Sequence, residues 1–182
     1  MQNKNGSLLK ICHLILIFAG VALCIYGCTF DNSTVLDKTA LILKIAALAS
    51  SFVYLIKGYK KDADLYYKTF MWILGIAEII GYTSLLNKGI QMPFFQGFIP
   101  VLTFVAFILI IGAKDYGKVK SNIVSVTLVV LCAYSALSKV VVSMSAVLSL
   151  RTIIAICQFI FASTAALMVR AKYNDKDSRG AK

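Results

Sequence analysis

Residues 66–86 read YYKTFMWILGIAEIIGYTSLL, and this stretch decides the class of fold. From Thr69 to Leu86 its only charged side chain is Glu78. A run of this length matches the roughly 20 apolar residues that an α-helix needs to cross the hydrocarbon core of a bilayer. The stretch therefore predicts a transmembrane helix.

Five further apolar runs of similar length flank it, near residues 8–30, 36–57, 94–113, 122–144 and 149–170. The chain is 59% hydrophobic and only 15% charged, with a mean hydropathy of +0.81, whereas soluble domains carry about a quarter charged residues. We therefore expect residues 1–182 to form a single all-α integral membrane domain. Its six transmembrane helices would form three hairpins, and residues 171–182 would be a basic tail.

The net charge of +11 is spread as short basic clusters between the apolar runs. The two ends of the chain and the connections after the second and fourth runs lie on one side of the predicted membrane, and together they hold 14 of the 19 Lys and Arg residues. The connections on the other side hold only Lys38 and Lys88. Basic residues concentrate in cytoplasmic loops, so both termini are expected in the cytoplasm, in a multi-pass protein of the bacterial cytoplasmic membrane. The clusters form no basic surface stripe, which argues against nucleic acid as a partner.

The five cysteines all lie within apolar runs, and no C-x-x-C motif occurs. This pattern predicts neither a disulfide framework nor a zinc site. Cys24 and Cys28 share a helix face. They are either a redox pair or, as we favour, small apolar side chains that pack against other helices. The first run is expected to remain attached as a membrane span, the alternative being a lipoprotein signal cleaved before Cys28.

Charged side chains within the hydrocarbon region are expensive and are by default functional candidates. Glu78 falls near the middle of its span, whereas Lys44, Lys139 and Arg151 fall within about two turns of the outer ends of theirs. If these side chains converge, they outline an outward-facing polar cavity with a surplus of positive charge. In the alternative, the long cationic side chains extend to the lipid headgroups.

Small and polar residues also recur at helical spacing. One face of the first span carries His13, Gly20, Cys24 and Gly27, and one face of the second carries Lys44, Ala47, Ser51, Tyr54 and Gly58. Such stripes are typical of helix–helix contacts in membranes. Tyr66, Tyr67 and Trp72 are expected in an interfacial aromatic belt, and Asp62 and Asp64 are expected as solvated loop charges.

The sequence favours a small transport or solute-binding protein for an anionic or zwitterionic solute or a lipid headgroup. The candidate ligand-binding residues are Glu78, Lys44, Lys139, Arg151, Gln158, Tyr82 and Ser135. The alternatives are a non-catalytic membrane adaptor, assembly or structural protein and, third, a membrane-embedded lipid enzyme. We expect no catalytic residues, metal or cofactor, because the chain has no phosphate-binding glycine loop, H-E-x-x-H or G-x-S-x-G motif. The expected partners are the lipid bilayer and membrane subunits or further copies of the chain.

Overall fold

The computed structural model describes residues 2–87 and 150–180. These residues form four long helices and one short 3₁₀ turn: α1 (Gln2–Cys28), α2 (Val35–Ile56), η1 (Lys61–Ala63), α3 (Asp64–Asn87) and α6 (Leu150–Gly180). Within the described ranges the secondary structure is helical and contains no strand. The predicted spans 94–113 and 122–144 lie outside these ranges.

Among the described residues, three stretches are long and apolar enough to cross a membrane: Ser7–Cys28, Val35–Ile56 and Thr152–Lys172. They overlap the predicted spans 8–30, 36–57 and 149–170. The predicted span 66–86 falls on α3, and its membrane crossing stays a prediction. On α1, large apolar side chains such as Leu8, Ile15 and Phe18 are about 60% exposed. An outward apolar face of this kind suits contact with lipid.

Local polar contacts fix where α2 begins and ends. Thr34 caps its N-terminus, and a reciprocal pair of bonds joins Thr34 to Asp37, which satisfies backbone N–H groups that have no partner within the helix. At the other end, Gly58 and Tyr59 both adopt positive φ, of 67° and 61°. Their N–H groups donate to the carbonyls of Leu55 and Tyr54, so the chain reverses direction before α3.

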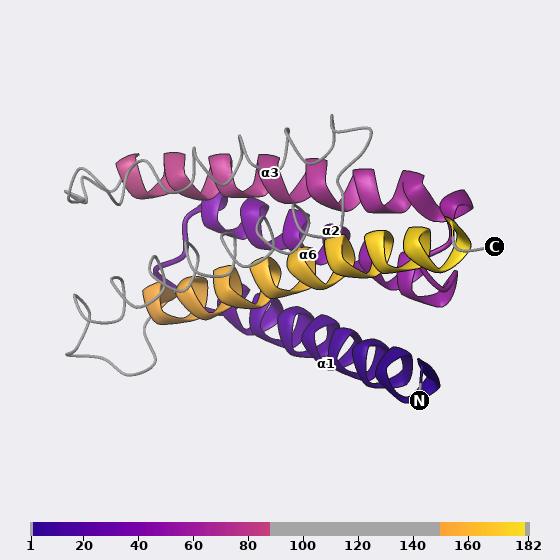
Figure 1. Ribbon diagram of the computed structural model, residues 1–182. Coiled ribbons are helices and arrows are strands. Elements are labelled where there is room, and N and C mark those ends of the chain that lie inside the picture. Colours follow the sequence, from indigo (N-terminus) through magenta and orange to yellow (C-terminus); the bar gives the residue numbers. More distant parts are fainter. Residues whose placement is uncertain (1, 88–149, 181–182) are drawn as a thin grey trace.

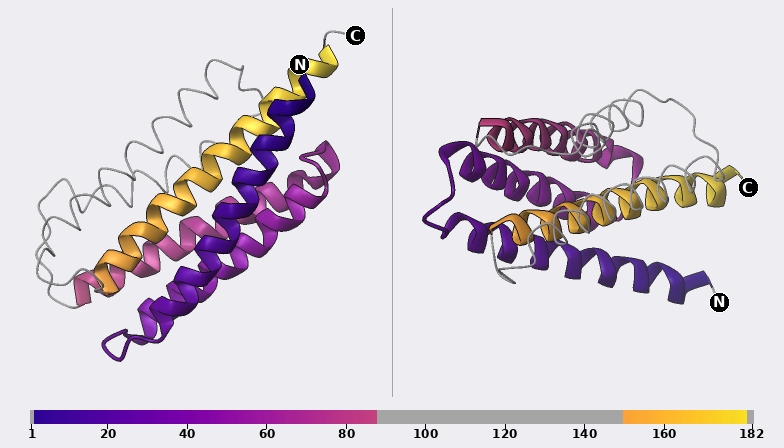
Figure 2. Two further views of the ribbon diagram at one scale, coloured as in Figure 1. Left: turned by 90° about the horizontal axis from the view of Figure 1, so that it is seen from below. Right: turned by 90° about the vertical axis from the view of Figure 1, so that its left-hand side faces the viewer.

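The helix α2 occupies the centre of the described bundle and packs against both α1 and α3 (Figure 1). The helix α6 runs antiparallel to α1 and packs against it, with a smaller contact to α3 (Figure 2). The beginning of α1, the connection between α2 and α3 and the last turns of α6 therefore lie at one end of the bundle. We call this the basic end, because Lys10, Lys57, Lys60, Lys68, Arg170 and Lys172 gather there.

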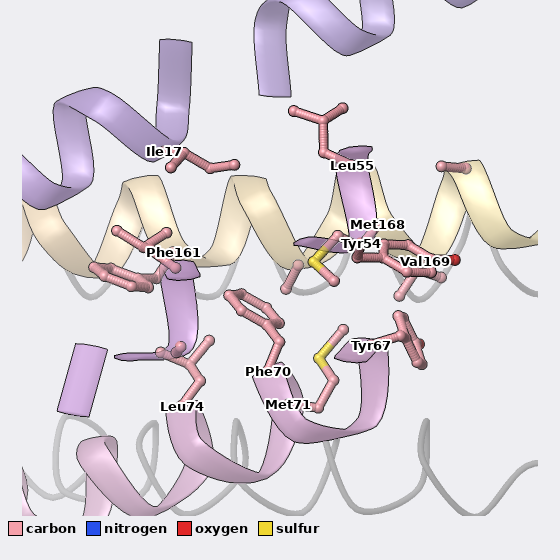
Figure 3. Close-up of a cluster of buried hydrophobic side chains, with 14 of the residues drawn as sticks. Ile17, Tyr54, Leu55, Tyr67, Phe70, Met71, Leu74, Phe161, Met168 and Val169 are labelled. Atoms are coloured by element: carbon pink, nitrogen blue, oxygen red, sulfur yellow. The ribbon is translucent and has the colours of Figure 1, made fainter. Parts of the chain in front are cut away.

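The core near the basic end is built from all four helices (Figure 3). Its side chains include Ile17, Tyr54, Leu55, Tyr67, Phe70, Met71, Phe161, Met168 and Val169. Tyr67 is fully buried there, with its ring 5.8 Å from that of Tyr54. The expectation that Tyr67 belongs to an interfacial aromatic belt is therefore wrong, because its ring fills the contact between α2 and α3, whereas Trp72 is 45% exposed.

Candidate functional site

The central helix α2 carries three buried polar side chains at intervals of seven residues: Asp37, Lys44 and Ser51. Seven residues are close to two helical turns, so the three lie on one face, about 10 Å apart along the axis. Each one bonds to a side chain of another helix. Three polar clusters are therefore stacked through the bundle.

The central cluster consists of Lys44, Glu78 and Gln158, which come from α2, α3 and α6. The Lys44 ammonium lies 2.8 Å from Glu78 Oε1, and the Gln158 amide donates to Glu78 Oε2 over 2.8 Å. The ring of Phe161 lies 5.6 Å from the ammonium group. Only 3% of Lys44, 7% of Glu78 and 9% of Gln158 is exposed. The structure thus brings together three of the residues that the sequence singled out.

Lys44 does not extend to the end of its helix. Its side chain turns into the bundle toward Glu78, so the alternative in which it reaches the headgroups is wrong for this lysine. The physical reason is the partner: a carboxylate that accepts two hydrogen bonds offsets part of the desolvation of the ammonium group. The same pairing explains how Glu78 is accommodated inside the helix bundle.

The cluster at the basic end consists of His13, Ser51, Tyr59 and Met168. His13 is fully buried, with Nδ1 3.0 Å from the Tyr59 hydroxyl and Nε2 2.6 Å from Ser51 Oγ. Ser51 donates to Met168 Sδ over 3.2 Å. Because the Ser51 proton is used in this bond, Ser51 Oγ can only accept from His13. His13 Nε2–H therefore donates to Ser51, and His13 Nδ1 accepts from the Tyr59 hydroxyl. Burial raises the pKa of the Tyr59 hydroxyl, which keeps it a donor.

The third cluster, at the opposite end, joins Thr34, Asp37 and Ser84. Asp37 Oδ2 accepts from the Thr34 backbone N–H at 2.8 Å and from its hydroxyl at 2.9 Å. Ser84 of α3 donates to Asp37 Oδ1 over 2.7 Å. This cluster fixes the start of α2 against α3. Asp37 therefore has a structural role that sequence reasoning missed.

The remaining candidates fall outside these clusters. Lys139 and Ser135 lie outside the described residues. Tyr82 and Arg151 belong to α3 and α6, but their side chains lie outside the described part. The proposed outward-facing cavity with its surplus of cations therefore stays a prediction.

At the basic end, the Asp64 carboxylate of α3 is paired with the Lys172 ammonium of α6. A second ammonium group, Lys68 Nζ, lies 3.4 Å from Asp64 Oδ2. Partial burial raises the pKa of the Asp64 carboxyl, but the two ammonium groups outweigh it and hold this pKa below its usual value. The expectation of a solvated loop charge is wrong for Asp64, because Lys172 reaches it across the bundle. Asp62, two residues earlier, is exposed.

Comparison with protein-family models, with curated proteins and with solved structures found no match for the chain. The feature of the chain that bears on function is therefore the chemistry of the central cluster.

Proposed function

We propose that the chain is a small membrane transport or solute-binding protein whose ligand meets the central cluster of Lys44, Glu78 and Gln158. The observation that carries the proposal is the Lys44–Glu78 ion pair, which is almost fully buried within the helices. Charged groups inside a membrane domain are expensive, and they commonly mark pathways for ions or solutes. Apolar side chains would join α2 to α3 without that expense.

The pair suits a zwitterionic solute, or a lipid headgroup that carries both signs of charge. A ligand carboxylate or phosphate would replace Glu78 at the Lys44 ammonium, while a ligand ammonium would replace Lys44 at Glu78. Each charge would then keep a partner throughout the exchange, which avoids an isolated buried ion. Gln158 can donate to either carboxylate and would hold Glu78 in place during the exchange. A purely anionic solute would use Lys44, with Glu78 binding a proton.

The proposal includes the finer membrane topology. We infer six spans in three hairpins, with both termini in the cytoplasm of a bacterial cell and the basic end facing inward. The support is the distribution of charge, because basic residues from three separate segments meet at one end of the bundle. In this arrangement the Thr34–Asp37–Ser84 cluster faces outward. The bilayer is the first partner, and further subunits or copies of the chain would complete an assembly.

A membrane adaptor or assembly protein is the second candidate. The observation that favours it is the mutual satisfaction of the central cluster, in which both oxygens of Glu78 have a partner. A unit of this kind also serves to hold three helices together. In that case the cluster is structural and needs no ligand.

Uptake into proteoliposomes tests the proposal. The purified chain is assayed with a labelled panel of zwitterionic amino acids, phosphocholine and inorganic phosphate. We expect one class to accumulate, and expect Glu78→Gln and Lys44→Met to lower its uptake at least tenfold. Lys38→Met is the matched control, because Lys38 lies on the same helix but is exposed, and it should leave uptake unchanged. Failure of every class to accumulate or bind, together with recovery of one constant partner from native membranes, would favour the adaptor instead.

A further inference from the structure

The helices α1 and α6 approach each other closely at two glycines. A Cβ atom placed on Gly20 would lie 3.3 Å from Ile160 Cγ2, and one placed on Gly27 would lie 3.5 Å from Ile153 Cγ2. Because the two helices are antiparallel, these contacts set their register. Gly20 lies opposite Ile160, and Gly27 lies opposite Ile153.

This register places two cysteines face to face. Cys24 lies four residues after Gly20 and three before Gly27, while Cys157 lies four residues after Ile153 and three before Ile160. Both are fully buried free thiols of the same hydrophobic core cluster, and the register of α1 and α6 sets them opposite each other. The two sulfur atoms are therefore neighbours on different helices although 133 positions separate them in the sequence.

Two further groups lie near this thiol pair. The Lys44 ammonium interacts electrostatically with both Cys24 and Cys157. Cys28, one turn further along α1 and only partly buried, interacts with both as well. The attacking form of a cysteine is the negatively charged thiolate, which the Lys44 ammonium attracts and the Glu78 carboxylate near Cys157 repels.

We propose that Cys24 and Cys157 are a redox modification site that forms a reversible disulfide between α1 and α6 when a hydroperoxide is the oxidant. One thiol gives up its proton, the resulting thiolate attacks a peroxide oxygen, and the O–O bond breaks to form a sulfenic acid. The leaving hydroxide of hydrogen peroxide, or alkoxide of an organic hydroperoxide, takes up that proton and departs as water or as an alcohol. The second thiol then attacks the sulfenic sulfur, the S–S bond forms, and the hydroxyl group leaves as water. The two thiols lose two electrons in total, and the peroxide gains them.

This site stands independently of the proposed transport function, because it rests on the contact between α1 and α6. The disulfide would fix α1 to α6 at the residue preceding Gln158, which donates to Glu78 in the central cluster. Oxidation would therefore restrict movement of α6 next to the buried ion pair.

The test uses a variant in which Cys12, Cys28 and Cys132 are replaced by Ser, so that only Cys24 and Cys157 remain. It is reconstituted in lipid vesicles and treated with hydrogen peroxide or with cumene hydroperoxide, which separates a water-borne from a membrane-borne oxidant. After denaturation, free thiols are labelled with a maleimide-polymer that shifts the gel mobility. We expect both thiols to be lost together with at least one oxidant, and both to return after reduction.

The matched control keeps Cys12 and Cys157 and replaces the other three cysteines by Ser. Cys12 lies on the same helix as Cys24 but is exposed, so no bond between α1 and α6 should form. Peptide mapping of the unsubstituted protein gives the same answer without substitutions. The proposal is overturned if Cys24 and Cys157 keep their thiols with both oxidants, if each is oxidised without a link, or if the link joins Cys24 to Cys28.

Discussion

The ammonium group of Lys44 belongs to the tenth residue of the 22-residue helix α2. Nine residues of helix measure about 13 Å, so to reach water at the Thr34 end the side chain would have to extend along about two turns of its own helix. Glu78 offers a nearer partner at 2.8 Å. A partner within reach therefore turns this lysine inward, and the resulting pair forms the centre of the cluster.

Glu78→Gln should destabilise the protein, because it leaves the Lys44 ammonium buried without its counter-charge. Removal of one partner from a buried pair costs about 3–5 kcal/mol in protein interiors. Lys44→Met in the same chain removes the stranded charge and should restore part of this loss. Thermal unfolding of the four proteins in a double-mutant cycle measures the coupling without knowledge of the ligand.

The control for this cycle pairs Glu78→Gln with Lys38→Met, and these two changes should be additive because Lys38 is exposed. Strict additivity of Glu78→Gln with Lys44→Met would contradict the prediction. If neither single change alters the thermal stability, the central cluster is also removed as a candidate site.

The polar faces of α1 and α2 were predictable from residue spacing. His13, Gly20, Cys24 and Gly27 are all buried, as a face turned toward other helices should be. Spacing within one helix does not say which helix a face meets, so neither the pairing of Cys24 with Cys157 nor that of His13 with Tyr59 could be foreseen. Asp37 was missed because it stands at a span boundary, although its seven-residue spacing from Lys44 and Ser51 was visible.

At the scale of the helices, Gly20→Ala should weaken the contact of α1 with α2 and α6. The added Cβ would lie 2.8 Å from Leu48 Cδ1 and 3.3 Å from Ile160 Cγ2, and Leu48 is fully buried. Overpacking a filled core costs about 1–3 kcal/mol, and over most of this range the cost is larger than the roughly 1 kcal/mol by which alanine favours a helix over glycine. We therefore expect a lower midpoint of thermal unfolding.

Gly81→Ala is the matched control, because among the described residues its Cβ would meet Ala40 Cβ alone, at 3.8 Å, an ordinary contact. This change should leave the midpoint equal or slightly higher. A stabilising effect of Gly20→Ala would show that α1 does not approach its neighbours as closely as the structure has it.

At the scale of the whole molecule, the distribution of charge and the order of the helices both mark out the same end of the bundle. The antiparallel order of α1 and α6 and the turn after α2 bring three separate basic segments to one end of the bundle. Tyr59 belongs to that turn, and its hydroxyl contacts His13 of α1, so the basic end is also held together by buried polar contacts. Placing this end in the cytoplasm requires only the usual preference for basic residues on that side.

This orientation predicts which positions react with an impermeant thiol reagent in intact cells. Single cysteines replace Asn87, Lys60 or Lys118 in a chain whose five native cysteines are replaced by Ser. Asn87, at the far end of α3 from the basic end, should be labelled without permeabilisation because residues 87–93 are expected outside. Lys60 and Lys118, in the expected cytoplasmic segments 57–68 and 114–120, should be labelled only after the membrane is opened. Labelling at Lys118 in intact cells would overturn the orientation, and equal labelling at Lys60 and Asn87 would show that α3 does not separate two sides of a membrane.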